Sequence, residues 1–289
     1  MKDLRSVLAK AQQNKVAVGH FNVSDFSVLR AVVEASRELN VPVIIGLSEG
    51  ERKFLGVRQV AALVRSLREE SELPIFLNAD HTHSIASAME AAKAGFDSIV
   101  FDLSSLPMEE NIRQTNSAVE TLKAINPAIL IEGEIGDIGT GSQIHDVAPD
   151  LVGGLTTPEQ AKEFVSATSV DILAPAVGNM HGMLLSMIQG NVRKRLNSTR
   201  IAEIKQATGS YLTLHGASGT ADTDLREAIS AGINVVHINT ELRVTWRQGL
   251  EKSLADNPKE VVPYKLLPPV IAAVKSVVTG RLKLFNNLQ

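Results

Sequence analysis

Four of the seven histidines lie at or just after short apolar segments that are spread along the chain. They are His81, His181, His215 and His237. A lone histidine in such a place is commonly a hydrogen-bonded structural residue, but several imidazoles buried together without a partner are energetically costly. Catalytic zinc typically takes three protein ligands and keeps one position open. A metal centre is therefore the first chemistry that these residues suggest.

The composition limits which residue types could bind a metal and which partners the protein could bind. The 289 residues include no cysteine, so a metal must bind to His, Asp or Glu. A formal net charge of −3 argues against a broad nucleic-acid surface but leaves room for a local phosphate site. We see no signal peptide and no run of about 18 apolar residues, so we expect neither secretion nor a membrane span. The expectation is a cytoplasmic protein with a small-molecule partner.

Eight short apolar segments alternate with amphipathic ones. This pattern is typical of parallel strands that are covered by helices. The predicted strands are Val16–Asn22, Val41–Ser48, Ile75–His81, Ser98–Leu103, Ala128–Gly133, Val170–Ala176, Tyr211–His215 and Ile233–Asn239. Helical patterns lie between them, for example at Phe26–Asn40 and Arg58–Arg68, and Gly95 and Gly232 are placed as helix C-caps.

Eight strand-then-helix units in a chain of this length predict a single-domain (β/α)8 TIM barrel over residues 1–289. A helix at Leu4–Asn14 is expected to cover the bottom of the barrel, and Leu266–Val278 is expected to form a helical tail. The alternative is a doubly wound open sheet. It is disfavoured because no Gly-x-Gly-x-x-Gly follows the first predicted strand.

Polar side chains stand at the C-terminal ends of the predicted strands, where a TIM barrel places its active site. Besides the histidines, these residues are Asn22, Ser48, Asp80, Asp102, Glu132, Glu134 and Asn239. None of the eight strands ends in lysine, which disfavours a Schiff-base enzyme. The pattern predicts that metal ligands and carboxylates meet on one rim.

Several motifs resemble, in order and spacing, those of class II (zinc-dependent) fructose-bisphosphate and tagatose-bisphosphate aldolases. The resemblance spans nearly the whole chain. It is carried by Phe21-Asn22-Val23, Ser48-Glu49-Gly50, Asn78-Ala79-Asp80-His81, Phe101-Asp102-Leu103-Ser104, Glu132-Gly133-Glu134-Ile135-Gly136, Gly178-Asn179-Met180-His181-Gly182 and Leu214-His215-Gly216-Ala217-Ser218-Gly219. Each motif is weak alone, and the combination is specific.

The resemblance implies a metal centre and an acid/base. His81, His181 and His215 would bind one zinc ion, with Glu134 as a ligand when the ion shifts. Asp80 would exchange a proton with the oxygen at the bond that is cut. This agrees with the chemistry of the residues, because a metal on a ketone oxygen stabilises an enediolate and a carboxylate beside it can act as a base.

The resemblance also implies a phosphosugar site. The phosphate of dihydroxyacetone phosphate would be held by four small residues: Gly182, Gly216, Ala217 and Ser218. A sodium or potassium ion would lie nearby. Small residues allow backbone N–H groups to approach phosphate oxygens. Further substrate contacts are expected from Asn22, Ser48, His237, Asn239 and Thr240.

Three departures from the family pattern stand out. The loop that follows the fifth strand lacks the Glu expected to remove the ketose proton, and Asp137, His145 or Asp146 could replace it. His237 stands where the family has a substrate-binding Asn, so either His237 or Asn239 could take that role. The Tyr-Lys expected after His181-Gly182 is absent, and the basic run at residues 193–195 or Arg243 could attract a second phosphate.

The resulting hypothesis is a homodimeric or homotetrameric carbon–carbon lyase of carbohydrate metabolism, such as glycolysis. Fructose 1,6-bisphosphate is the expected substrate; tagatose 1,6-bisphosphate or an atypical phosphoketose is the alternative. A metal-dependent barrel hydrolase is disfavoured, because the first strand offers only His20 and Asn22 in place of His-x-His. A phosphosugar-binding paralogue without turnover is suggested by the altered loop, and the intact Asp80 argues against it.

Overall fold

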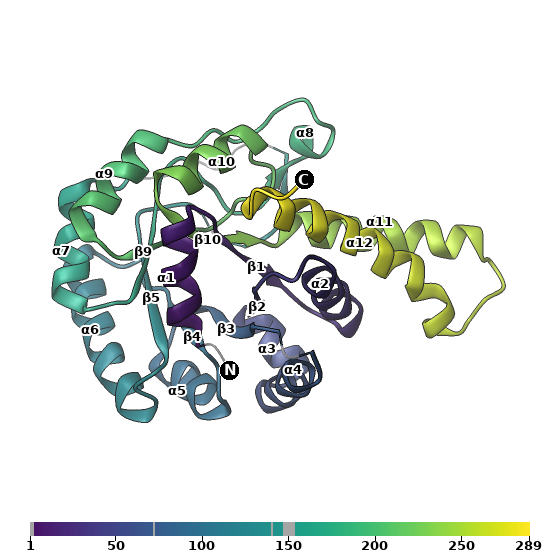
Figure 1. Ribbon diagram of the computed structural model, residues 1–289, viewed down its shortest axis with the longest axis horizontal. Coiled ribbons are helices and arrows are strands. Elements are labelled where there is room, and N and C mark those ends of the chain that lie inside the picture. The colour runs from purple at the N-terminus through teal and green to yellow at the C-terminus, as the bar shows by residue number, and fades with distance from the viewer. Residues whose placement is uncertain (1–2, 72, 140, 147–153) are drawn as a thin grey trace.

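The computed structural model describes residues 3–71, 73–139, 141–146 and 154–289. Eight parallel strands close into a barrel in the order β1-β10-β9-β7-β5-β4-β3-β2 (Figure 1). These strands are β1 (Val18–Asn22), β2 (Val43–Leu47), β3 (Ile75–Thr82), β4 (Ser98–Phe101), β5 (Leu130–Ile135), β7 (Ile172–Pro175), β9 (Tyr211–Leu214) and β10 (Ile233–Ile238). The predicted barrel and its eight strands are therefore confirmed.

Helices surround the barrel, as the amphipathic segments predicted. They are α1 (Leu4–Asn14), α2 (Phe26–Leu39), α3 (Glu49–Leu55), α4 (Val57–Ser71), α5 (Ile85–Ala94), α6 (Met108–Ile125), α7 (Pro158–Thr168), α8 (Leu185–Ile188), α9 (Ser198–Thr208), α10 (Asp222–Ala231), α11 (Thr240–Asp256) and α12 (Pro263–Phe285). Gly95 and Gly232 follow α5 and α10 with φ angles of 92° and 131°, which confirms them as C-caps.

The N-terminal end of the barrel is closed by α1, which lies across the opening in Figure 1. Asp3 caps the helix by accepting a hydrogen bond from the Ser6 N–H at 2.7 Å. The apolar stripe Leu4, Val7, Leu8 and Ala11 packs against the first residues of the strands: Val18, Ile44, Phe76, Leu130, Ile172 and Val235. The predicted cover of the barrel bottom is confirmed.

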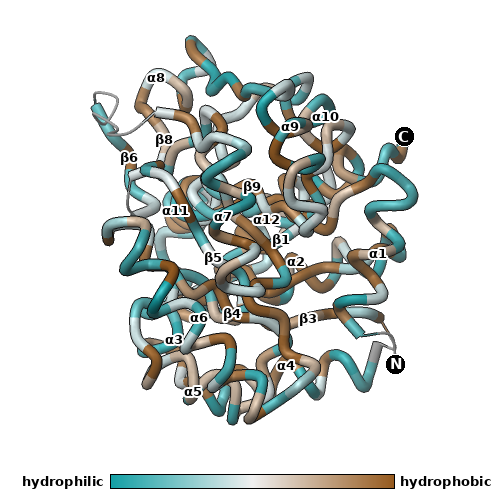
Figure 2. The backbone as a smooth tube through the Cα atoms, turned by 90° about the vertical axis from the view of Figure 1, so that its left-hand side faces the viewer, coloured by the Kyte–Doolittle hydropathy of each residue, from teal (hydrophilic) through white to brown (hydrophobic). Residues whose placement is uncertain are grey.

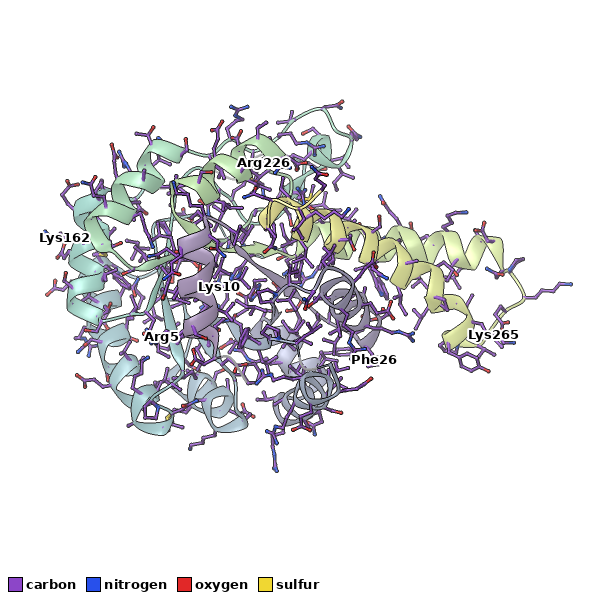
Figure 3. The ribbon with its side chains drawn as sticks, viewed as in Figure 1. Arg5, Lys10, Phe26, Lys162, Arg226 and Lys265 are labelled. Atoms are coloured by element: carbon purple, nitrogen blue, oxygen red, sulfur yellow. The ribbon has the colours of Figure 1, made fainter. Side chains whose placement is uncertain are left out.

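The larger core lies between the strands and the surrounding helices. Its fully buried side chains include Phe21, Ile45, Ile75, Phe96 and Phe164. Figure 2 shows hydrophobic segments around β3 and β4 in the interior of the molecule, and Figure 3 shows charged side chains such as Lys10 and Lys162 pointing outward. Burial on both faces explains why the strands read as continuous apolar segments.

The C-terminal tail forms a longer helix than predicted. It continues through Pro268 and Pro269 as α12, and it packs beside α11 in an arm that projects from the barrel, with Lys265 near its tip (Figures 1 and 3). Ser253 Oγ donates a hydrogen bond of 2.7 Å to the Leu266 carbonyl, which ties the two helices together. Contacts with α11 and α2 thus outweigh the hydrogen bonds that the prolines cannot donate.

Two short strands stand apart from the barrel, near its C-terminal rim. β6 (Ile144–His145) pairs in parallel with β8 (Met183–Leu184). A two-residue strand is too short to leave a periodic signal, so sequence analysis missed both. Among the residues that the structure describes, no helix is long and apolar enough to cross a membrane.

Candidate active site

A cavity of about 290 Å³ opens at the C-terminal ends of the barrel strands. Most of the predicted site residues line it: Asn22, Ser48, Asp80, His81, His181, Gly182, Gly216, Ser218, His237, Asn239 and Thr240. Glu134, His215 and Ala217 are buried and do not line the cavity surface. The chain thus brings predicted residues from six of its eight barrel strands, or from the loops that follow them, to one site.

A bulge at the end of β3 presents both Asp80 and His81 to the cavity. Successive side chains of a regular strand point to opposite faces. Here Ala79 pairs with Ile99 but Thr82 pairs with Phe101, so β3 carries one residue more than β4 over this stretch. His81 absorbs the extra residue with a φ of 38°, a left-handed conformation that is uncommon outside glycine. The strained backbone places an acid/base candidate and a ligand candidate side by side.

A buried arginine holds this bulge. Arg52 is 2% exposed and donates to the carbonyl oxygens of Leu47 at 2.6 Å and Asp80 at 3.0 Å, and to Thr82 Oγ1 at 3.0 Å. These bonds satisfy a carbonyl at the end of β2 and, in the bulged part of β3, one carbonyl and one hydroxyl. The bulge is therefore fixed from behind by α3, a role that sequence analysis did not assign to Arg52.

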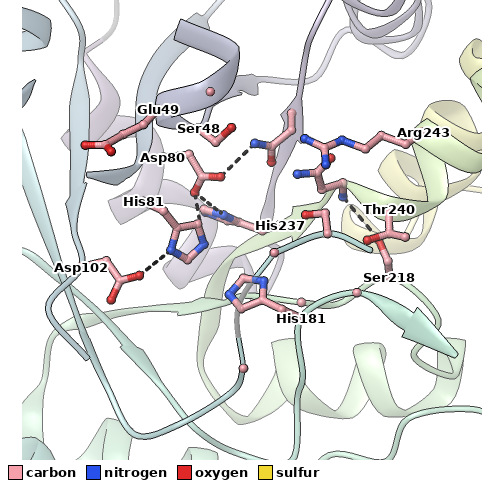
Figure 4. Close-up of a pocket in the computed structure, with 18 of the residues that line it drawn as sticks. Ser48, Glu49, Asp80, His81, Asp102, His181, Ser218, His237, Thr240 and Arg243 are labelled. Carbon is pink, nitrogen blue, oxygen red and sulfur yellow. Dashed lines mark hydrogen bonds and ion pairs between the residues drawn. The ribbon is translucent and has the colours of Figure 1, made fainter. Parts of the chain in front are cut away.

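Four side chains form a group that could hold one metal ion. His81, Glu134, His181 and His215 each offer a ligand atom, and these atoms lie within 4.8 Å of one another. The ring centroid of His81 lies 4.7 Å from that of His181 and 4.8 Å from that of His215. The structure therefore brings together the four predicted ligands. Figure 4 shows His81 facing His181 across the site, with Asp80 beside it.

Carboxylates orient two of these imidazoles. His81 Nδ1 lies 2.7 Å from Asp102 Oδ2, and His215 Nε2 lies 2.6 Å from Glu132 Oε1. Metal-binding histidines commonly use their second nitrogen in this way, because the partner fixes the ring and its tautomer. Asp102 and Glu132 were predicted at the rim, and the structure shows what they contact.

The donor set fits a cation. Glu134 Oε2 and His215 Nδ1 lie 3.0 Å apart, yet neither makes a hydrogen bond, and both are fully buried. Burial and the charge of Asp102 raise the pKa of Glu134, while burial and the neighbouring His81 and His215 hold the pKa of His181 well below its usual range. Despite burial, Asp80 raises the pKa of His81 to about 9, and Glu132 and Glu134 raise the pKa of His215 well above its usual range. A divalent ion would displace these protons and bind the imidazole and carboxylate lone pairs directly. Among the described residues, this is the group best suited to a metal.

Asp80 is a buried carboxylate, and only one of its two oxygens accepts a hydrogen bond. Its Oδ2 accepts a hydrogen bond of 2.8 Å from Asn22 Nδ2, and its Oδ1 has no hydrogen-bond partner. Burial alone would raise the pKa of Asp80, but His81 and His237 outweigh it and hold the pKa well below the ordinary value. His237 Nδ1 lies 3.4 Å from Oδ1. Asp80 is thus held ionised beside the proposed metal group.

His237 belongs to a stack of three imidazoles. Its ring is parallel to that of His20, with centroids 3.4 Å apart, and lies 4.2 Å from that of His215. Burial and the neighbouring His20 and His215 hold the pKa of His237 well below its usual range. A neutral imidazole at this place can donate or accept a hydrogen bond. The stack shows how the chain accommodates a ring at a position where the family pattern has an amide.

A second carboxylate, Glu51, joins the cavity to α11. Its Oε2 accepts hydrogen bonds from Asn22 Nδ2 at 3.0 Å and from the Ser48 N–H at 2.8 Å, and its Oε1 pairs with Arg243 at 2.6 Å. Glu51 was not among the predicted site residues. The signal was present, because Ser48-x-x-Glu51 is a capping-box pattern, which the structure shows at the start of α3.

The predicted phosphate loop follows β9. Gly216 has a φ of 57°, and a Cβ at this position would collide with the Met180 carbonyl. Ser218 Oγ accepts hydrogen bonds of 3.3 Å from the backbone N–H groups of Asn239 and Glu241, at the start of α11. The hydroxyl therefore keeps its own proton available for an acceptor in the cavity. Tight glycine turns and N–H groups near a helix start are typical of anion sites.

The two candidate bases of the altered loop lie outside the cavity lining. His145 is partly buried in β6, and a Cβ on Gly182 would approach its Nε2 to 2.6 Å, so its ring lies against the backbone of Gly182. Asp146 is exposed. From the same loop, Gly139, Gly141 and Ser142 do line the cavity. Residues 147–153 fall outside the described part of the chain.

The basic run that follows α8 does not form one surface. Lys194 is only 4% exposed, and its ammonium group donates to three backbone carbonyl oxygens, those of Met180, Gly182 and Gly216. Arg195 is exposed and pairs with Asp224 at 3.2 Å. Lys194 therefore has no donor left for a second phosphate, and of the predicted candidates only Arg243 lines the cavity.

Comparisons with known proteins agree with this geometry. The family model "Fructose-bisphosphate aldolase class-II" matches residues 2–289. The chain is 33% identical to a fructose-bisphosphate aldolase of Thermus caldophilus, covering 98% of this chain and 97% of that protein. It is 31% identical to one of Geobacillus stearothermophilus, covering 98% and 96%.

Solved structures show the same relationship. The YdjI aldolase of Escherichia coli K12 superposes with a TM-score of 0.82 at 30% identity, over 98% of this chain and 96% of that one. The fructose-bisphosphate aldolase of Campylobacter jejuni, at 20% identity and a TM-score of 0.82, shows the shared fold alone. Since the resemblance runs from end to end and includes the rim, the chain belongs to the class II fructose-bisphosphate aldolases, a family of metal-dependent carbon–carbon lyases.

Proposed function

We propose that the protein is a zinc-dependent aldolase that cleaves and forms fructose 1,6-bisphosphate. One observation carries the proposal: ligand atoms of three histidines and of Glu134 converge within 4.8 Å, beside the Asp80 oxygen that makes no hydrogen bond. Dihydroxyacetone phosphate and an aldehyde phosphate would be the products of cleavage.

His81, His181 and His215 would hold the metal, with Glu134 as the alternative ligand. A bound zinc would supply Lewis-acid polarisation of the ketose carbonyl. The chain's own part is to keep the imidazoles fixed, through Asp102 for His81 and Glu132 for His215. Because these partners are already in place, the rings need little reorganisation when the ion binds.

Asp80 would be the acid/base. In cleavage, its open Oδ1 accepts the proton of the hydroxyl at the carbon that becomes the aldehyde; in synthesis it returns that proton. The bond from Asn22 Nδ2 to Oδ2 keeps the carboxylate oriented while Oδ1 works. Asp80 is only 3% exposed although it lines the cavity, so few water molecules can compete for the proton.

The phosphate of the triose half would lie against Gly182, Gly216, Ala217 and Ser218, with Asn239 and Thr240 at the start of α11. The small side chains allow direct contact with backbone N–H groups, and the Ser218 hydroxyl can donate. His237 and Ser48 also line the cavity, and they would contact the sugar hydroxyls. His145 and Asp146 remain the candidates for the base at the triose carbon.

The second phosphate is assigned to Arg243, which lines the cavity and whose side chain is 41% exposed. Tagatose 1,6-bisphosphate is the second candidate substrate, since it differs from fructose 1,6-bisphosphate at one stereocentre. The names of the relatives favour fructose 1,6-bisphosphate. A binding paralogue without turnover has no need for the oriented Asp80.

The test combines metal analysis with turnover. The purified protein is assayed for bound metal by mass spectrometry and for triose phosphate release from both ketose bisphosphates, before and after chelation. Release that stops with chelator and returns with zinc supports the proposal. Phosphosugar binding without release, in the zinc-loaded protein, would replace it by the binding-protein hypothesis. Light scattering of the same sample tests the expected homodimer or homotetramer.

A further inference from the structure

A buried lysine ends at the meeting point of the two loops that carry the proposed phosphate site. Lys194 Nζ lies 2.7 Å from the Met180 oxygen, 2.7 Å from the Gly182 oxygen and 2.8 Å from the Gly216 oxygen. Met180 and Gly182 flank His181, and Gly216 follows His215. The ammonium therefore contacts the backbone on both sides of His181 and directly after His215, two of the proposed metal ligands.

The geometry is that of a bound cation. An ammonium group has three N–H donors, and three carbonyl oxygens take all of them. Carbonyl oxygens that converge on one point are also the ligands by which proteins replace the hydration shell of an alkali cation. In the described part of the chain, Lys194 has no carboxylate within ion-pair distance. Burial lowers the pKa of Lys194 to about 7, while the charge of Glu241 acts in the opposite direction. In its protonated form, which is favoured below pH 7, the ammonium is compensated by backbone dipoles and its charge is available to a nearby anion.

The backbone of Lys194 is fixed to the same loop. Its N–H donates to the Gly219 carbonyl at 3.2 Å, and the residue forms an isolated parallel bridge with Thr220. Main chain and side chain thus connect three segments: residues 180–182, residues 216–220 and the segment that follows α8. Loss of the side chain would remove its three bonds to the two loops and leave the bond from Asn179 Nδ2 to the His215 oxygen as a connection between them.

We propose that Lys194 is the built-in cation of the phosphate loop and takes the place of the sodium or potassium ion that the family resemblance led us to expect. An ion bound to these three oxygens would have to occupy the position of Nζ, so the two exclude each other. Lys194 donates nothing to substrate; it is a positioning residue that holds the phosphate N–H groups and places a positive charge behind them. The proposal rests on the proposed phosphate site, not on aldolase turnover.

The first test uses the wild-type protein and inorganic phosphate as the probe. Phosphate affinity is measured by calorimetry at constant ionic strength in sodium, potassium or tetramethylammonium chloride. We expect the dissociation constant to change by less than about twofold among the three salts, because no alkali ion takes part. Phosphate binding that requires sodium or potassium would overturn the proposal.

The second test removes the ammonium. In tetramethylammonium chloride, Lys194→Ala is expected to bind phosphate about tenfold more weakly, and sodium or potassium should restore part of the affinity by entering the vacated carbonyl cage. A merely structural lysine would show the loss without this ion-specific rescue. Arg195→Ala is the matched control: it removes an exposed charge one residue away and should respond equally to all three salts.

A second variant distinguishes loss of the ammonium from a folding defect. Lys194→Met retains most of the side-chain volume but fills the cage, so its phosphate affinity should fall without rescue by any alkali ion. Melting temperatures of all variants in each salt identify those that fold. A folded Lys194→Ala that binds phosphate like wild type in tetramethylammonium chloride contradicts the proposal. Failure of the proposed aldolase function would show in turnover and leave these binding results unchanged.

Discussion

The two ends of the barrel are built on opposite principles. At the N-terminal end, α1 closes the opening with an apolar cluster around Leu8, which is fully buried. At the C-terminal end, buried polar atoms of the described residues lack hydrogen-bond partners: His20 Nδ1, Asp80 Oδ1, Glu134 Oε2, His215 Nδ1 and Asn239 Oδ1. Such atoms are destabilising unless a ligand satisfies them. The contrast separates the end of the barrel that stabilises the fold from the end that carries the proposed site.

The largest effect is expected on turnover, from Asp80→Asn at the C-terminal end of the barrel. The amide keeps the size of the side chain but cannot accept a proton, so turnover should fall by about 10²–10⁴-fold, the usual contribution of a positioned acid/base. Zinc content should stay at the wild-type level, which mass spectrometry checks beside the turnover assay. Activity within a few-fold of wild type would show that Asp80 does not have the assigned role.

Leu8→Ala should show the opposite behaviour at the other end. Truncation of a fully buried leucine leaves a cavity and typically lowers the free energy of unfolding by about 2–5 kcal/mol. Turnover per folded molecule should not change, because α1 lies at the end of the barrel away from the cavity. Chemical denaturation and the turnover assay give the two quantities, with exposed Lys10→Ala as the control. Lost turnover in folded Leu8→Ala would break the separation of the two ends.

Glu132→Gln tests a residue behind the metal group. The amide removes the charge that fixes His215, and loss of such a partner commonly weakens metal binding by about 10–100-fold. Competition with a chromophoric chelator measures the affinity. The exposed Glu120→Gln serves as the control. Equal zinc affinity in Glu132→Gln and wild type would mean that the 2.6 Å contact does not tune the ligand.

The smallest effect at the C-terminal end is expected from His145→Ala. If the altered loop holds the base, exchange of the triose-phosphate proton with solvent should slow by about tenfold, below the range of a fully positioned base, because His145 does not line the cavity. Deuterium incorporation followed by NMR measures this step. An unchanged exchange rate removes His145 from the mechanism and directs attention to Asp146 and the rest of the loop.

The sequence was most informative where the signal is local and repeated. Apolar segments of four to eight residues predicted all eight strands, and the fold rule for barrel strand ends then placed Asp80 and His81 on the correct rim. Several predicted strands begin two residues early, as at Val16 and Val41, because apolar residues enter the core before strand pairing starts. Boundaries depend on pairing, which the sequence does not display.

Features that depend on distant backbone could not be predicted. Lys194 reads as part of a basic surface run, since its partners are carbonyl oxygens, which no side-chain pattern reveals. The stacking of His237 on His20 joins strands at opposite ends of the sequence and follows only from their pairing in the closed barrel. The predicted tail, Leu266–Val278, is shorter than α12, because the contacts of α12 with α2 and α11 are tertiary.

The left-handed turn at His81 has a consequence for how the protein would lose its metal. A residue held in an unfavourable conformation stores free energy, and binding of an ion to its imidazole would offset that energy. Metal affinity and the integrity of the third barrel strand are then thermodynamically linked. A chelated sample should therefore exchange its backbone amides at residues 79–83 faster than a zinc-loaded one, while the amides under α1 exchange alike in both.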